Sequence, residues 1–202
     1  MPTENHIHCV GFHPYAHQRA VIDAIGKSKC SYKTVVVKSS RQKGKSFMIA
    51  NILLYFALNW NKTKNICVSP TLKQAKNIYK TIMDAIEKTG IVKNSNATDL
   101  EITFINRSNI RFLSAEMGES LRGYTVTGIL CIDECCYISD EVFNTIKPWV
   151  DYNKSPILMV STPYVKEGFF WQYYNYGLEG VNKVITVDWC DPKFKKEMDK
   201  IL

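Results

Sequence analysis

The sequence predicts an α/β fold with a central, mostly parallel β-sheet, helices on its faces and an inserted β-hairpin. Short apolar runs rich in β-branched residues alternate with helical patterns along most of the 202 residues, and this alternation is typical of a parallel sheet. Two runs of alternating apolar and polar residues, 101–106 and 109–114, flank Arg107-Ser108 as the strands of a hairpin do. A hydrophobic content of 46% gives one domain over residues 1–202 enough apolar surface for its own core.

The first half of the chain predicts helix and strand in turn. A helix is expected from Pro14 to Gly26, since proline favours the first turn of a helix and glycine its end. Val35 to Val37 indicates a buried strand. Residues 47–60 are apolar nearly all round, which predicts a helix buried on most of its faces. A second strand, Asn65–Ser69, leads into a second helix that begins at Pro70-Thr71 and runs to about Lys88.

The second half continues the alternation after a break. Gly90 and the polar run Lys93–Asp99 interrupt regular structure before the hairpin. Beyond the hairpin the patterns predict helices at 140–150 and 191–202, and strands at 128–134, 156–160 and 184–187. The glycine-bounded aromatic cluster 168–177 can stack on bases beside nearby lysines, but core packing is the expected role because aromatic side chains are mostly buried.

Charge and cysteine content narrow the class of protein. A net charge of +7 and a pI near 9.0 favour a polyanionic partner. Seven cysteines, several of them in predicted strands, fit a reduced, cytosolic protein better than a disulfide framework. No apolar run has the length of a membrane span, and the N-terminal residues lack the layout of a secretory signal, so we expect no membrane contact.

The stretch Thr34 to Ser46, TVVVKSSRQKGKS, has the pattern of a phosphate-binding loop between a strand and a helix. Gly44 lets backbone N–H groups approach phosphate oxygens, and the following helix adds its positive end. In this pattern Lys45 reaches the β- and γ-phosphates, while the Ser46 hydroxyl holds Mg²⁺. Ser39 stands where the first glycine of the pattern is usual, so a solvated basic turn stays open as an alternative.

An acidic pair, Asp133-Glu134, ends the predicted strand GILCIDE. A carboxylate at the end of a strand next to the phosphate-loop strand can bind the Mg²⁺ that bridges the phosphates. A second carboxylate can take a proton from the attacking water, and consecutive strand-end residues point in different directions. The alternative is an acidic pair at a helix N-terminus, because Ser139 and Asp140 follow as a cap.

Three further polar groups are candidates. Arg122, beside Gly123, offers a planar charged group of the kind that stabilises a transferring phosphoryl group, or is a surface arginine. Ser161-Thr162, at the end of a predicted strand, can sense the γ-phosphate through a hydroxyl group, or form a polar turn before Pro163. Gln18 can read an adenine edge with its amide, or face solvent on its helix.

Taken together, these motifs resemble the ATPase domain of large terminase subunits, the DNA-packaging motors of tailed bacteriophages and herpesviruses. The resemblance rests on Tyr15 with Gln18, then SSRQKGKS, SLRGYTVTGILCIDE and ILMVSTP, and spans about residues 13–190. It implies a RecA-like P-loop NTPase fold of the ASCE class, with ATP and Mg²⁺ in the site. It also implies that ATP hydrolysis drives double-stranded DNA into a viral procapsid.

The resemblance implies a role for each matching position. The nucleotide contacts are Gln18, Ser40, Arg41, Gln42, Lys43, Gly44, Lys45 and Ser46. The implied metal ligands are Ser46 and Asp133, Glu134 is the catalytic carboxylate, and Ser161, Thr162 and Pro163 couple hydrolysis to movement. Arg122 matches an arginine finger acting in trans, and Arg41 a phosphate-side contact, although either can be the finger.

The resemblance also implies a setting. The expected partners are double-stranded DNA, further copies in a ring, a portal and a small terminase subunit, in the cytoplasm of an infected host cell. Nuclease activity is not expected, because no acidic cluster follows Asp191, where only Glu197 and Asp199 remain. Two other classes stay open: a helicase-like remodelling ATPase, and a nucleic-acid-binding assembly module with a weak nucleotide site.

Overall fold

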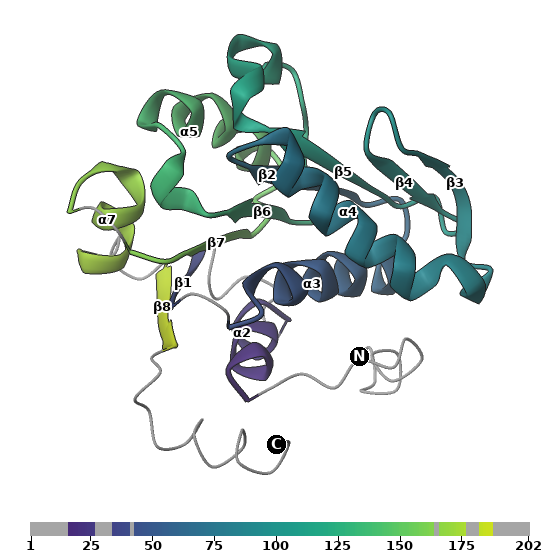
Figure 1. Ribbon diagram of the computed structural model, residues 1–202, viewed down its shortest axis with the longest axis horizontal. Coiled ribbons are helices and arrows are strands. Elements are labelled where there is room, and N and C mark those ends of the chain that lie inside the picture. The colour runs from purple at the N-terminus through teal and green to yellow at the C-terminus, as the bar shows by residue number, and fades with distance from the viewer. Residues whose placement is uncertain (1–15, 27–33, 41–42, 164–165, 177–181, 188–202) are drawn as a thin grey trace.

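A parallel-rich β-sheet organises the molecule (Figure 1). The computed structural model describes residues 16–26, 34–40, 43–163, 166–176 and 182–187. Within them the strands are β1 Thr34–Ser39, β2 Lys64–Ser69, β3 Val92–Asn96, β4 Glu101–Phe104, β5 Asn109–Ser114, β6 Leu130–Asp133, β7 Ile157–Ser161 and β8 Asn182–Val187. The helices are α2 Ala16–Gly26, α3 Lys45–Asn59, α4 Leu72–Ile86, α5 Asp140–Ile146, α6 Pro148–Asp151 and α7 Gly168–Asn175, with 3₁₀ turns η1 Glu87–Thr89, η2 Ala115–Leu121 and η3 Cys135–Tyr137.

The strands lie in the order β3-β4-β5-β2-β6-β7-β1-β8. From β5 to β8 all neighbours are parallel, whereas β4 is antiparallel to both β3 and β5. The α/β class with an inserted hairpin is therefore confirmed. One detail was wrong: the strand ending in Asp133 is not next to the phosphate-loop strand, because β7 lies between β6 and β1. Chain order does not fix strand order in a sheet built by crossover connections.

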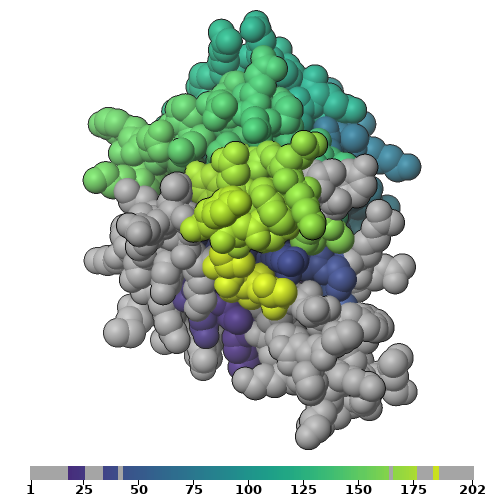
Figure 2. All heavy atoms as spheres, turned by 90° about the vertical axis from the view of Figure 1, so that its left-hand side faces the viewer, coloured from purple at the N-terminus to yellow at the C-terminus, as the bar shows by residue number. Residues whose placement is uncertain are grey.

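Both faces of the central strands are covered, which explains their unbroken apolar runs. In β1 the side chains of Val35 and Val37 belong to the buried cluster that contains the apolar residues of α2, α3 and α4, while Val36 belongs to the cluster on the other face, with those of α5, α6 and α7. Figure 1 shows these two helix layers on opposite sides of the sheet. Figure 2 shows the end of the molecule at which α7 lies against the edge strand β8, drawn in yellow. Phe169 and Phe170 of α7 are buried, as core packing of the aromatic cluster requires.

Two predicted boundaries changed. The polar run expected to break the chain contains β3, an edge strand whose exposed residues carry no apolar pattern that could reveal it. The helix expected at 140–150 is divided into α5 and α6, because Pro148 has no N–H for the helix ladder and starts a new turn. The predicted helix 191–202 and Pro14 lie outside the described residues. None of the helices in the described ranges is long and apolar enough to cross a bilayer.

Candidate active site

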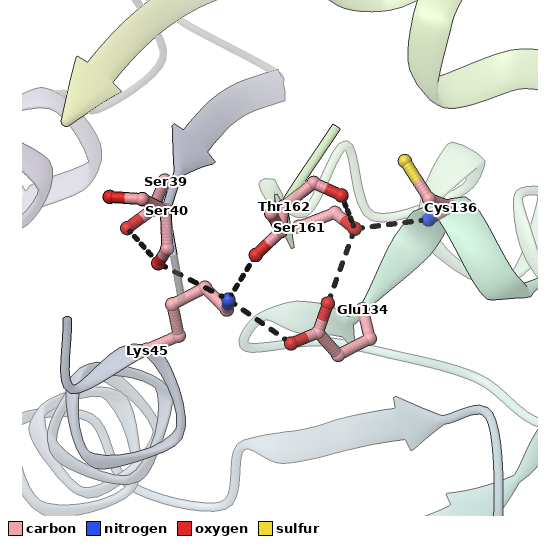
Figure 3. A network of polar contacts seen from close by, with 7 residues as sticks. All are labelled: Ser39, Ser40, Lys45, Glu134, Cys136, Ser161 and Thr162. Atoms are coloured by element: carbon pink, nitrogen blue, oxygen red, sulfur yellow. Dashed lines mark hydrogen bonds and ion pairs between the residues drawn. The ribbon is translucent and has the colours of Figure 1, made fainter. Parts of the chain in front are cut away.

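Three neighbouring strands bring the motifs to one edge of the sheet. β6, β7 and β1 are parallel, so their carboxyl ends lie side by side, where such sheets place ligands. Figure 3 shows Lys45, Glu134, Ser161 and Thr162 pointing toward one another from the ends of these strands and the segments that follow them. Residues separated by 117 positions in the chain are thus in direct contact.

The loop after β1 turns at Gly44. This glycine has φ 67° and ψ 29°, a left-handed conformation that side chains rarely allow, and α3 begins at the next residue. A Cβ here would lie 3.4 Å from Nε2 of Gln18. Gln18 is fully buried, so the alternative of a solvated helix residue is wrong. The glutamine instead packs against the backbone of the loop.

Lys45 connects the three motifs. Its Nζ donates to Oγ1 of Thr162 at 2.5 Å and to the carbonyl oxygen of Ser40 at 3.5 Å, and lies 3.1 Å from Oε1 of Glu134. The side chain of Lys45 is 8% exposed and that of Glu134 21%, so water screens this ion pair far less than a surface pair. A cation held at this point has all three of its donors directed at oxygen atoms.

The two acidic residues face different surroundings. Asp133, the last residue of β6, is 3% exposed, and in the described part of the chain its Oδ1 has no hydrogen-bond partner. Glu134 adopts φ 45° and ψ 50°, which is uncommon for a residue with a Cβ. This turn directs its carboxylate to Lys45 and to Ser161, whose Oγ donates to Oε2 at 3.4 Å.

Burial raises the pKa of Asp133 to about 7, and the neighbouring charge of Glu134 adds to the effect. The Lys45 ammonium and the backbone N–H of Glu134 oppose it. A divalent cation would favour the ionised form in the same way as an ammonium does. The unpaired carboxylate oxygen of Asp133 and the hydroxyl of Ser46, which lines the cavity in the first turn of α3, are oxygen donors of the kind that fits Mg²⁺.

Ser161 links the carboxylate to the segment after β6. It is fully buried at the end of β7, and its Oγ accepts the backbone N–H of Cys136 at 3.2 Å while donating to Glu134. The next residue, Thr162, contacts Lys45. Ser161, at the end of β7, and the residue after it thus form hydrogen bonds with both charged side chains of the site.

A cavity of about 720 Å³ opens beside Lys45, a size usual for small-molecule sites. The predicted residues among its walls are Lys43, Gly44, Lys45, Ser46, Glu134 and Thr162. The cavity is also lined by residues that no sequence motif indicated: Phe47, Pro70, Thr71, Gln74 and Tyr137. Pro70 and Thr71 directly follow β2, a parallel strand that ends at the same edge. The sequence predicts this strand but not its place beside β6.

The remaining candidates lie elsewhere. Arg122 is not among the residues that line the cavity; its side chain is 72% exposed and pairs with Glu119, itself 85% exposed, at 3.4 Å. Pro163 follows Thr162 and is half-buried. Arg41 and Gln42, together with Tyr15, lie outside the described residues.

The site combines a glycine turn and a lysine between a strand and a helix, a carboxylate pair at the end of a second strand, and hydroxyl groups at the end of the strand that lies between these two. This combination defines a P-loop NTPase of the ASCE class. The family model "Terminase large subunit, T4likevirus-type, N-terminal" matches residues 37–170, more than half of the chain. The chain therefore belongs to this family of terminase large subunits, ATPases that drive phage DNA packaging.

Solved structures share the fold. The large terminase ATPase domain of Thermus phage P74-26 is 19% identical, with a TM-score of 0.76 over 98% of this chain and 90% of that one. The HK97 bacteriophage large terminase is 15% identical, with a TM-score of 0.77 over 90% of this chain and 40% of that one. The large terminase of a thermophilic bacteriophage, solved in complex with ATP-gamma-S, is 13% identical, with a TM-score of 0.72 over 94% of this chain and 50% of that one. No curated protein sequence matches.

Proposed function

We propose that this chain hydrolyses Mg·ATP at the Lys45–Glu134 site and that hydrolysis moves double-stranded DNA into a viral procapsid. The observation that carries the proposal is the contact of Lys45 with both Glu134 and Thr162. These contacts connect the lysine of the phosphate-binding loop, the carboxylate and the proposed coupling segment in one network, beside a cavity of suitable size for a nucleotide.

The chain's own residues supply the steps. Lys45 and the backbone around Gly44 bind the β- and γ-phosphates, and the phosphate oxygens take the place of Glu134 as partners of the ammonium. Glu134, now free of Lys45, orients the attacking water and accepts its proton. Asp133 and Ser46 would hold Mg²⁺, which neutralises charge on the phosphates. The nucleotide contacts are completed by Gln18, Ser40, Gln42 and Lys43.

Two arginines are assigned to the transferring phosphoryl group. Arg122 acts in trans on the site of a neighbouring copy in a ring, since its exposed position outside its own cavity leaves it accessible to another subunit. Arg41 contacts the phosphates of its own site. An arginine finger contributes about 10³–10⁵ in rate, so a monomer alone is a poor ATPase. Arg122→Ala in the assembled protein lowers the ATPase rate, and normal hydrolysis contradicts the assignment.

The movement of Glu134 passes to β7 through its hydrogen bond from Ser161. Ser161, Thr162 and Pro163 are the coupling segment in this proposal. The ring works on a portal with a small terminase subunit in the host cytoplasm, and residues 1–202 act as one ATPase domain without nuclease activity. Incubation with duplex DNA and Mg²⁺ or Mn²⁺ leaves the DNA intact; cleavage would contradict this last point.

The decisive experiment measures ATPase rate against protein concentration, together with Mg·ATP binding. We expect the rate to rise more steeply than linearly, because a neighbour completes the site. Lys45→Ala abolishes binding, while Lys88→Ala, which removes an exposed lysine from η1, leaves it unchanged. Undiminished binding by Lys45→Ala would show that the loop is not the phosphate grip.

A further inference from the structure

Helix α4 carries its charges in two separate halves. Its core side is apolar and consists of Ala75, Ile78, Ile82 and Ile86. The opposite side exposes Lys73, Lys76 and Lys80, three and four residues apart and thus on one face, before any acid occurs. Asp84 and Glu87 follow only at the far end. The half of α4 nearest its N-terminus is therefore a uniformly basic face, which we call the lysine face.

The lysine face does not serve the stability of the helix. In the described part of the chain none of its three lysines forms an ion pair. Like charges at these spacings repel each other, and cations near a helix N-terminus oppose the helix dipole. The first turn holds no acidic residue of its own; its end is stabilised by a capping box between Thr71 and Gln74 and by the Glu116 carboxylate, which accepts the N–H of Leu72 at 3.1 Å. The three lysines therefore add nothing to the stability of α4 by themselves, and an anion lying against them would offset their mutual repulsion.

The lysine face adjoins the nucleotide cavity. Thr71, the cap of α4, and Gln74, in its first turn, line the cavity from the side of β2. Lys73 lies between them in the sequence and is exposed on the outer side. Figure 1 shows α4 beside α3, the helix that begins at Lys45. The cavity wall and the lysine face thus share the first turns of one helix.

We propose that the lysine face binds the phosphate backbone of double-stranded DNA; this rests on the proposed function in DNA packaging. Lys73 and Lys80 are seven residues apart, about 10 Å along a helix axis. That distance is the axial rise of about three phosphates on one DNA strand. Lysines bind phosphates as point charges without reading bases, as translocation of any sequence requires.

The test compares two triple variants with the same loss of charge. Lys73→Gln, Lys76→Gln and Lys80→Gln together remove the lysine face; Lys64→Gln, Lys88→Gln and Lys93→Gln remove three exposed lysines elsewhere. Binding of a fluorescent 30-base-pair duplex is measured by anisotropy from about 50 to 200 mM salt. We expect the first variant to reduce the slope of log affinity against log salt by about 2.7, at about 0.9 per phosphate contact, and to weaken binding at low salt by about tenfold or more.

The control variant keeps the wild-type slope. The proposal is overturned if both variants lose the same DNA affinity or if the first variant loses none. It is also overturned if the wild type does not bind duplex DNA or prefers duplex RNA of the same length. Mg·ATP binding without DNA and the thermal melting curve are recorded for all three proteins and are expected to agree. A wild type that binds DNA through the lysine face but not Mg·ATP would refute the proposed ATPase site while leaving this surface established.

Discussion

The two edges of the sheet carry buried polar networks of opposite character. At the amino ends of β2, β5 and β6, Asn65 is fully buried and every group of its amide is bonded. Its Nδ2 donates to Thr63 Oγ1 at 3.1 Å and to the carbonyl oxygen of Asn109 at 3.0 Å, and its Oδ1 accepts the N–H of Ile129 at 3.2 Å. The network is neutral and complete, so it fixes three strands relative to one another.

At the carboxyl edge the network is charged and incomplete. Lys45 and Glu134 form an ion pair, Glu134 is held in a left-handed conformation, and buried atoms of three residues lack hydrogen-bond partners in the described part of the chain. These atoms are Oγ of Ser40, Oγ of Ser69 and Oδ1 of Asp133, at or just beyond the ends of β1, β2 and β6. Unsatisfied buried groups cost stability, and their concentration at one edge marks the place where function is built.

The largest expected effect separates activity from stability at the carboxyl edge. Glu134→Gln keeps an oxygen for Lys45 but removes the proton acceptor, so the ATPase rate falls by about 10²–10⁴. The free energy of unfolding changes by about 1 kcal/mol or less, the net value of one hydrogen bond. Steady-state hydrolysis and urea unfolding on the same preparation measure both. Retained hydrolysis would reject Glu134 as the base.

The amino edge is expected to behave in the opposite way. Asn65→Ala leaves the N–H of Ile129 and the carbonyl oxygen of Asn109 without partners, which lowers the free energy of unfolding by about 2–4 kcal/mol. Gly128→Ala has a similar effect, because its Cβ would lie 2.0 Å from Oδ1 of Asn65. Mg·ATP affinity of the remaining folded protein is unchanged. Asn94→Ala, at an exposed asparagine of β3, is the control and stays within about 0.5 kcal/mol.

The contrast also explains what the sequence could reveal. Strands and helices followed from local periodicity, and the residues of the phosphate loop and acidic pair from short motifs whose members are adjacent in the chain. Gln18 carried a usable signal as well, since it precedes the buried Val21 and Ile25 at helical spacings. Its burial was predictable from that face.

What could not be predicted depends on strand order. The place of β7 between β6 and β1 puts Thr162 against Lys45, and the pairing of β2 with β6 puts Pro70 and Thr71 in the cavity wall. Neither neighbourhood is encoded locally. The Asn65 network could not be predicted for the same reason, because its partners Asn109 and Ile129 lie 44 and 64 residues away from it in the chain.

The smallest effect tests the incomplete edge through pH. Because the pKa of Asp133 is about 7 in the folded chain and its ordinary value is 3.8, the folded state keeps a proton that the unfolded chain releases. Stability therefore falls as pH rises from about 4 to about 7, with a slope of at most about 1.4 kcal/mol per pH unit. Asp133→Asn removes this contribution, so its stability advantage over the wild type grows by about 1 kcal/mol between pH 5 and pH 6 in chelator-containing buffer. If the free energies of unfolding of the two proteins depend on pH in the same way, Asp133 is already ionised in the folded chain. The carboxyl edge would then stabilise this buried charge as fully as the amino edge satisfies the amide of Asn65.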